Sequence, residues 1–316
     1  MEDDIEETPL PGEKIIKIVF TGLDNAGKTS ILNILQKQYS KLGGALKPTT
    51  GIERKTLNIL GYDIINWDLG GQEKYRIDYL DEESRVFDGT DLLFYVVDIS
   101  SRERFYESLE YYKNILWSAF ESVDPNNLPY IIICLHKFDP DLENDDMIAE
   151  NIQLAKELFE ENSKDYRIKF FTTSIFDEWS IIKAFSYGLQ RLASKLEILE
   201  KLLKRFAEAT YSDAILLLDG SALPIGEYYN NQIASDIINI LAPNFAPIYE
   251  KLSKLNINID KIWTEFGGKY SLFMRIEVNK QPYFIIVVTL KENIYDILNR
   301  LPEFSKTLGN VLKTFF

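Results

Sequence analysis

The first part of the chain alternates short apolar runs with amphipathic stretches of helical period. Such alternation predicts βα units on a largely parallel sheet. Gly61 separates two adjacent strand-like runs, which predicts one hairpin and therefore an antiparallel edge strand. The predicted strands are Lys14–Thr21, Glu53–Leu60, Tyr62–Leu69, Asp91–Asp98, Tyr130–His136 and Arg167–Thr173. The predicted helices between them are Lys28–Tyr39, Glu103–Phe120, Asp145–Glu161 and Trp179–Leu192.

The pattern changes near residue 194, where a helical period runs into the order α-β-β-α-β-β-β-α. This order predicts an antiparallel sheet with helices, and hence a separate α+β domain. Two prolines, Pro243 and Pro247, are expected to break or kink the helix predicted over Gln232–Leu255. The predicted elements are a helix at Ser194–Thr210, strands at Ala214–Leu218 and Ala222–Tyr228, the helix at Gln232–Leu255, strands at Asn256–Phe266, Lys269–Val278 and Pro282–Leu290, and a helix at Ile294–Leu312.

These patterns together divide the 316 residues into three parts. An acidic N-terminal tail occupies residues 1–13. An α/β domain with a six-stranded, mostly parallel sheet follows over residues 14–194, and the α+β domain occupies residues 195–316. We expect the boundary near residue 194 to run from helix to helix, because no linker rich in Gly, Ser or Pro is present there.

Charge and composition exclude several classes of protein. The formal net charge is -14 and no block of Lys and Arg stands out, which argues against nucleic-acid binding and against direct docking on anionic lipid. No apolar stretch approaches the ~18 residues of a membrane-spanning helix. The single cysteine excludes an internal disulfide framework and fits a reducing compartment. We therefore expect a cytoplasmic protein that reaches a membrane only through a partner.

The sequence GLDNAGKT, residues 22–29, matches the phosphate-loop pattern G-x-x-x-x-G-K-[ST] between a predicted strand and a predicted helix. In such a loop, backbone N–H groups and the helix N-terminus bind phosphate oxygens. Lys28 would reach the β- and γ-phosphates, and the Thr29 hydroxyl would bind Mg²⁺. The predicted nucleotide-binding residues of this segment are Gly22, Asp24, Asn25, Ala26, Gly27, Lys28, Thr29 and Ser30.

Two further segments fit the triphosphate end of a nucleotide. In WDLGGQ, Asp68 suits a role in holding Mg²⁺, the Gly71 N–H can approach the γ-phosphate, and Gln72 can orient the attacking water. In KPTTGIE, a threonine hydroxyl could reach Mg²⁺ when the γ-phosphate is present. Thr49 is the first choice and Thr50 the second, and either could instead be an ordinary turn residue.

The sequence HKFD follows the fifth predicted strand, at the sheet edge where α/β proteins bind ligands. Asp139 can accept hydrogen bonds from guanine N1–H and the 2-amino group, whereas adenine would leave this carboxylate unpaired. The Lys137 stem can lie along the base. A lone histidine such as His136 is more often structural, but here it can also position the loop. After the sixth strand, Ser174 and Ile175 could present backbone N–H groups to guanine O6.

In this order, the motifs resemble those of the Ras-like small GTPases. GLDNAGKT and WDLGGQEKYR are similar to the Arf branch, whereas a histidine in HKxD and the segment TSIFDE resemble the Rag branch. The element order of the tail resembles the roadblock domain that follows the Rag G domain. The resemblance implies a GTP/GDP switch with Mg²⁺, homo- or heterodimerisation through the roadblock domain, and GTPase-activating and exchange proteins as regulators.

These observations leave several functions open. The first is a signalling switch with slow GTP hydrolysis, in which Gln72, Lys28 and Thr49 are the catalytic candidates. Arg76 and Arg54 could supply an arginine finger only by their closeness in sequence, and are otherwise interpreted as surface charges. The alternatives are a nucleotide-binding scaffold with little turnover that assembles roadblock complexes, an Arf-like trafficking GTPase, and an ATP-using enzyme.

Overall fold

The computed structural model describes residues 15–39, 52–59, 62–81, 85–163, 165–192, 194–257, 259–278 and 281–313. They form two compact units that divide between Asp177 and Glu178. The division falls before the boundary predicted near residue 194. The tail predicted over residues 1–13 lies outside the described residues. Among the helices described, none is both long enough and apolar enough to cross a membrane.

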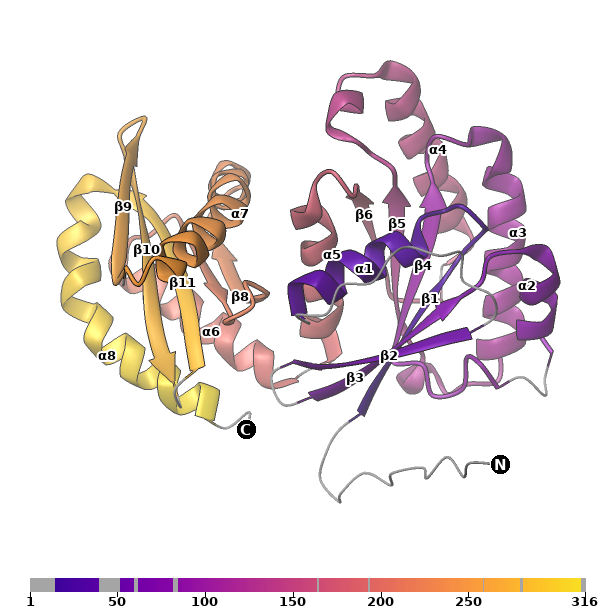
Figure 1. Ribbon diagram of the computed structural model, residues 1–316, viewed down its shortest axis with the longest axis horizontal. Coiled ribbons are helices and arrows are strands. Elements are labelled where there is room, and N and C mark those ends of the chain that lie inside the picture. Colours follow the sequence, from indigo (N-terminus) through magenta and orange to yellow (C-terminus); the bar gives the residue numbers. More distant parts are fainter. Residues whose placement is uncertain are drawn as a thin grey trace. The chain divides into compact units, whose positions relative to one another are not determined.

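The first unit is built on a six-stranded sheet in the order β2-β3-β1-β4-β5-β6 (Figure 1). Only the β2–β3 pair is antiparallel, as Gly61 predicts; the other neighbouring strands are parallel. Its strands are β1 (Ile15–Thr21), β2 (Ile52–Ile59), β3 (Tyr62–Leu69), β4 (Leu92–Asp98), β5 (Tyr130–His136) and β6 (Ile168–Thr173). Its helices are α1 (Lys28–Tyr39), α2 (Glu73–Tyr79), α3 (Phe105–Ile115) and α4 (Asp146–Glu161). The predicted mostly parallel sheet is therefore confirmed.

Burial explains why the central strands are continuous apolar runs. In β4 and β5 almost every side chain is buried, as expected for parallel strands covered on both faces. Tyr95 of β4 packs against Tyr112 of α3 and Phe159 of α4, with ring centroids 4.9 and 5.6 Å away. Cys134, the only cysteine in the chain, is buried in β5, and burial raises the pKa of its thiol to about 12.

The second unit has a five-stranded antiparallel sheet in the order β8-β7-β11-β10-β9. Helices α6 and α8 contact each other on one face, and α7 covers the other (Figure 1). Its strands are β7 (Ala214–Leu218), β8 (Pro224–Tyr229), β9 (Lys261–Phe266), β10 (Lys269–Val278) and β11 (Gln281–Leu290). Its helices are α5 (Glu178–Leu192), α6 (Ser194–Thr210), α7 (Gln232–Lys254) and α8 (Ile294–Leu312). From α6 onward, the predicted order α-β-β-α-β-β-β-α is confirmed.

Helix α5 groups with this second unit. The Ser186 hydroxyl donates a hydrogen bond to the Pro224 carbonyl of β8, and Gln190 Nε2 donates to the same carbonyl over 3.2 Å. These contacts involve buried polar groups, which need partners inside a protein. They explain why the division lies one helix before the boundary that periodicity alone predicts.

Helix α7 corrects one expectation. It continues through Pro243 and Pro247, so the prolines do not break it, and the helix predicted over Gln232–Leu255 is confirmed to within one residue. Each proline removes one backbone donor, but the core holds the helix on either side of the loss. Ala242 and Phe245 are buried, and the Phe245 ring lies 5.3 Å from that of Phe273 in β10. Tertiary packing of this kind routinely overrides local propensity.

Candidate nucleotide-binding site

Residues Gly22–Gly27 form the loop between β1 and α1, as the phosphate-loop pattern predicts. Gly22 has φ +135° and Gly27 has φ +99°, in a region that favours glycine. A Cβ at Gly22 would lie 2.3 Å from the Val96 carbonyl oxygen. Since β1 lies between β3 and β4, the loop sits where the strand order reverses, which is the usual ligand position in such sheets.

Lys28 is buried inside this loop. Its Nζ donates hydrogen bonds to the carbonyl oxygens of Gly22 (3.0 Å) and Leu23 (2.7 Å). Burial lowers the pKa of Lys28 to about 8, although the negative charges of Asp68 and Asp24 act in the opposite direction. A buried cation gains most from a nearby anion, because desolvation leaves its charge poorly compensated.

Thr29 and Asp68 meet beside the loop. Asp68 is fully buried at the end of β3, and the Thr29 Oγ1 donates to its Oδ2 over 2.6 Å. A hydroxyl and a carboxylate are the hard oxygen ligands that Mg²⁺ prefers, so these two side chains fit that ion. Ser30 follows in the first turn of α1 and is partly buried. Thr49 and Thr50 lie outside the described residues.

The Gly71 backbone lies directly against the phosphate loop. Its carbonyl accepts a hydrogen bond of 2.9 Å from the Asp24 N–H. A Cβ at Gly71 would lie 2.3 Å from that nitrogen, so a side chain here would displace the loop. The next residue, Gln72, is exposed and immediately precedes α2, without a capping hydrogen bond from its side chain. The predicted γ-phosphate segment thus lies beside the predicted phosphate loop.

The HKFD segment leaves β5 at the same sheet edge. His136 is buried, and its Nδ1 lies 2.9 Å from the Thr173 hydroxyl. Burial, with the nearby positive charge of Lys137, lowers the pKa of His136 to about 4, so its ring is neutral at pH 7. A neutral imidazole can donate one hydrogen bond and accept another, as positioning of a loop requires.

Lys137, Asp139 and Ser174 form the rest of the candidate base site. Lys137 has φ +66°, and its Nζ donates to Asp98 Oδ2 over 2.6 Å. The Ser174 hydroxyl donates to Asp139 Oδ1 over 2.5 Å, which joins the loop after β5 to the loop after β6. Ile175, the next residue, is 43% exposed. The two loops that were predicted to contact guanine are therefore adjacent.

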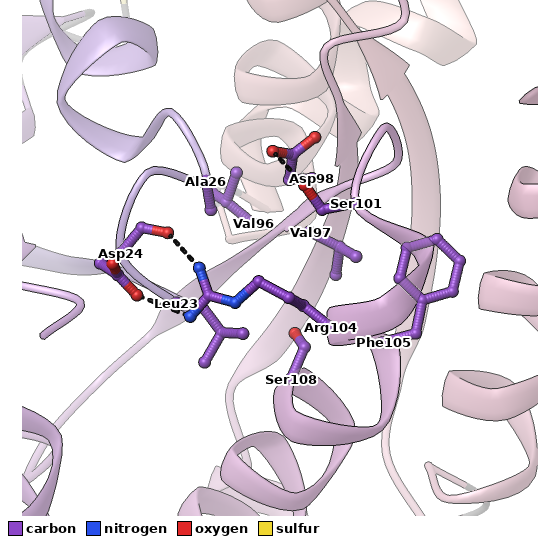
Figure 2. A pocket seen from close by; sticks show the side chains of 10 residues that line it. All are labelled: Leu23, Asp24, Ala26, Val96, Val97, Asp98, Ser101, Arg104, Phe105 and Ser108. Carbon is purple, nitrogen blue, oxygen red and sulfur yellow. Dashed lines mark hydrogen bonds and ion pairs between the residues drawn. The ribbon is translucent and has the colours of Figure 1, made fainter. Parts of the chain in front are cut away.

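Sequence reasoning missed two charged residues near the phosphate loop. Asp98 ends β4 and binds Lys137; burial raises the pKa of its carboxyl, but hydrogen bonds from Lys137 and Ser100 outweigh this and lower it. Arg104 bonds to Asp24 beside a small cavity between the loop and α3, as Figure 2 shows. An aspartate at a strand end was a readable signal for Asp98, whereas nothing local marks Arg104.

Arg76 also differs from expectation. Its side chain is only 12% exposed, and its Nη2 lies 2.7 Å from Glu107 Oε1. The interpretation as a surface charge is therefore wrong. The guanidinium also lies 5.2 Å from the centre of the Tyr111 ring. The side chain of Arg54, the other arginine considered, lies outside the described part of the chain.

Comparisons with known proteins extend over both units. The chain is 28% identical to GTP-binding protein gtr1 of Schizosaccharomyces pombe over 86% of this chain and 88% of that protein. It is 25% identical to Ras-related GTP-binding protein A of Dictyostelium discoideum, over 93% of this chain and 94% of that protein. A structure of the Arl6 BBS3 small GTPase from Trypanosoma brucei, with bound nucleotide analogue GppNp, has a TM-score of 0.46 and 19% identity, covering 56% of this chain and 97% of that one.

The family comparison covers most of the chain. The model of the Gtr1/RagA G protein conserved region matches residues 17–255. This range begins in β1 and includes the phosphate loop, the HKFD segment and the second unit as far as the end of α7. The protein therefore belongs to the Gtr1/RagA family of G proteins.

Proposed function

We propose that this protein is a molecular switch that binds GTP and GDP and slowly hydrolyses GTP to GDP and phosphate. The observation that carries this proposal is the convergence at one sheet edge of the phosphate loop, the Gly71 backbone and the Asp139–Ser174 pair. The phosphate loop would bind the nucleotide's phosphate chain, the Gly71 N–H would bind the γ-phosphate, and the Asp139–Ser174 pair would bind the guanine base. Membership of a G-protein family supports the same function.

The residues divide the chemistry among them. Lys28 would compensate the charge that develops on the β- and γ-phosphates, while the Gly71 N–H would donate to the γ-phosphate. Thr29 and Asp68, with Thr49 as a further candidate, would hold Mg²⁺. When bound, this ion would supply positive charge to stabilise the phosphate oxygens. Gln72, exposed at the start of α2, would orient the attacking water. Since Arg76 and Arg104, beside the site, are already paired with Glu107 and Asp24, we expect a GTP hydrolysis rate of about 10⁻⁴–10⁻² s⁻¹ without an activator.

The test is single-turnover GTP hydrolysis by the full chain, with Gln72→Leu as the diagnostic variant. We expect GTP to bind in preference to ATP, and Gln72→Leu to slow hydrolysis at least about tenfold while still binding GTP. Gln153→Leu is the matched control, because Gln153 is exposed on α4, away from the site. Equal hydrolysis by Gln72→Leu and the parent would refute the role of Gln72. Equal affinity for ATP and GTP would refute the guanine site.

The second unit supports an additional role in assembly. Ile233, Ile240 and Ile248 recur on one side of α7 and are 67%, 66% and 42% exposed. Strand β9 ends the sheet order, so within the described residues one of its edges has no strand neighbour. An exposed apolar helix face and an open strand edge each favour association with another chain. We therefore propose roadblock-type pairing through α7 and β9, with a second copy or a related chain.

Solution mass, measured by light scattering with GDP and with a GTP analogue, tests this pairing. A dimer that Ile240→Glu converts to monomer would support it. Ile198→Glu is the control, because Ile198 on α6 is 50% exposed and lies on another helix. A dimer unaffected by Ile240→Glu would refute this surface. A monomeric parent would refute self-pairing, and turnover by the same sample distinguishes a switch from a scaffold with little hydrolysis.

A further inference from the structure

Four charged side chains of alternating sign connect the phosphate loop to helix α2. Arg104 bonds to Asp24 twice, from Nη2 to Oδ1 over 2.7 Å and from Nη1 to the backbone oxygen over 3.2 Å. Figure 2 shows the guanidinium of Arg104 directed at Asp24. Arg104 Nε also donates to Glu107 Oε2 over 3.0 Å. Glu107 Oε1 in turn accepts from Arg76 Nη2 over 2.7 Å. We call these four residues the ion chain.

The surroundings of Asp24 and Glu107 favour the charged form of both carboxylates. Burial would raise the pKa of Asp24, but the hydrogen bond and charge of Arg104 outweigh it and lower that pKa. Hydrogen bonding to Arg104, and then to Arg76, lowers the pKa of Glu107 despite some burial. Isolated surface ion pairs contribute little to protein stability. Arginine contacts that use two nitrogens within a network are stronger, and they fix the relative orientation of the bonded side chains.

The ion chain connects the phosphate loop to the segment that carries Gln72. Asp24 belongs to the phosphate loop, and its N–H donates to the Gly71 carbonyl. Arg76 lies one helical turn beyond Gln72, and its N–H donates to the Gln72 carbonyl over 3.1 Å. The segment from Gly71 to Arg76 is therefore attached to the loop at both ends. At its far end, the attachment runs through two side chains of the 3₁₀ turn and helix α3, Arg104 and Glu107.

We propose that Arg104 and Glu107 are positioning residues for GTP hydrolysis, which hold the Gln72 segment in place over the phosphate loop through the ion chain. This inference rests on the proposed function. Arg104 has a second effect, because it compensates the negative charge that Asp24 places in a loop meant for phosphates. Loss of Glu107 should therefore affect hydrolysis alone, whereas loss of Arg104 should also weaken GTP binding more than GDP binding.

The experiment compares the full-length parent with Glu107→Ala, Glu107→Gln and the control Glu110→Ala. Glu110 lies on the same helix and bonds only locally, to Lys113 over 2.8 Å. Three quantities are measured: single-turnover hydrolysis, dissociation of fluorescent GDP and of a GTP analogue, and hydrogen exchange of residues 72–80. We expect both Glu107 variants to hydrolyse GTP about tenfold more slowly, with nucleotide affinities within about twofold of the parent and faster exchange in α2.

The outcomes separate the inference from the function on which it rests. If both Glu107 variants match Glu110→Ala in hydrolysis or in α2 exchange, the ion chain does not position Gln72. If they lose nucleotide affinity in proportion to hydrolysis, their role is structural and the inference is wrong. If the parent neither binds GTP in preference to ATP nor hydrolyses it, the proposed function fails, and the inference fails with it.

Arg104 provides an independent check. Arg104→Ala should weaken binding of the GTP analogue about tenfold more than binding of GDP. Adding Asp24→Asn to this variant should restore the ratio of the two affinities without restoring hydrolysis. Arg104→Lys keeps the charge but loses the fork, so it should bind nucleotide like the parent and hydrolyse slowly. A GTP-to-GDP affinity ratio that Arg104→Ala leaves unchanged would overturn the electrostatic part of the proposal.

Discussion

Gly27 and His136 are in such close contact that a Cβ on Gly27 would lie 2.3 Å from His136 Cδ2 and 2.6 Å from Nε2. The glycine belongs to the loop after β1 and the histidine to the end of β5. The two motifs therefore support each other: the flat imidazole packs on the loop, and the loop leaves room for no side chain there. The loop motif predicts a glycine at position 27, but only the fold shows that the His136 ring also requires it.

Gly27→Ala should destabilise the protein and abolish nucleotide binding. Two costs combine: φ of +99° and a clash with a buried ring. We expect the free energy of unfolding to fall by about 2–5 kcal/mol in urea titrations. Gly89→Ala is the matched control, because Gly89 has φ +63° with no atom near its Cβ position and so carries the backbone cost alone. Equal losses in the two variants would show that the histidine contact is not rigid.

His136→Asn should reduce the loss of stability that the protein suffers in acid. The folded pKa of His136 is about 4, against about 6.5 in the unfolded chain. The unfolded state therefore binds the extra proton between these values, and the free energy of unfolding falls as pH falls from about 6.5 to 4. The shift corresponds to about 3 kcal/mol.

This loss can be measured cleanly because His136 is the only histidine. Urea titrations of parent and His136→Asn at pH 7 and at pH 4.5 give the difference directly. The asparagine variant should lack most of the fall between these pH values. Parallel pH profiles for the two proteins would mean that His136 takes up its proton in the folded state without a penalty.

Asp139→Asn should shift base preference from guanine to xanthine. An asparagine amide can donate to the 2-oxo group of xanthine, whereas the parent carboxylate would accept from the 2-amino group of guanine. We expect the affinity for GTP to fall at least about a hundredfold and the affinity for xanthosine triphosphate to rise. Both affinities are measured by competition with a fluorescent nucleotide. Asp141→Asn, at an exposed position two residues further on, is the control. An unchanged order of affinities would exclude Asp139 from base recognition.

Asp219→Asn should stabilise the second unit at neutral pH. Asp219 Oδ1 accepts from the Ser221 and Leu223 N–H groups, at 2.8 and 2.9 Å, which an amide oxygen can also do. Burial raises the pKa of Asp219 to about 6, and these bonds offset it only in part. The folded state therefore binds the extra proton, so the free energy of unfolding falls as pH rises from about 4 to 6 and stays lower above it.

The asparagine variant has no such charge to bury. At pH 7.5 we expect it to unfold with a free energy about 1–3 kcal/mol higher than the parent, and at pH 4 with nearly the same free energy. Asp260→Asn, at an exposed position, controls for the change in net charge. A variant no more stable than the parent at pH 7.5 would show that Asp219 is well solvated.

The strands of the first unit could be predicted to within about one residue, because most of them are apolar or alternating runs bounded by polar residues. Helix α2 could not, since Glu73–Tyr79 is short, mostly polar and without helical periodicity. The predicted start of the ninth strand at Asn256 is also wrong; the strand begins at Lys261. Asn256 has φ +58° and belongs to the turn that ends α7. Alternating Asn and Ile residues imitated a strand there.

The candidate site divides along the same line. Residues whose role depends on local sequence, such as Lys28 and Asp139, could be identified from motifs, and the structure brings them to one sheet edge. Arg104 could not, because its partner Asp24 is 80 positions away and only the fold brings them together. The interpretation of Arg76 fails for the same reason: its partner Glu107 and the Tyr111 ring lie on α3, which the sequence does not place beside α2.

The burial of Cys134 makes this protein convenient for labelling. A thiol that is 1% exposed, with its pKa raised to about 12, reacts slowly with maleimides at neutral pH. Because it is the only cysteine, any cysteine introduced on the surface becomes a unique attachment point without further mutation. A dye pair on α2 and α3, or a spin label on α7, could therefore report movement and pairing in the otherwise native chain.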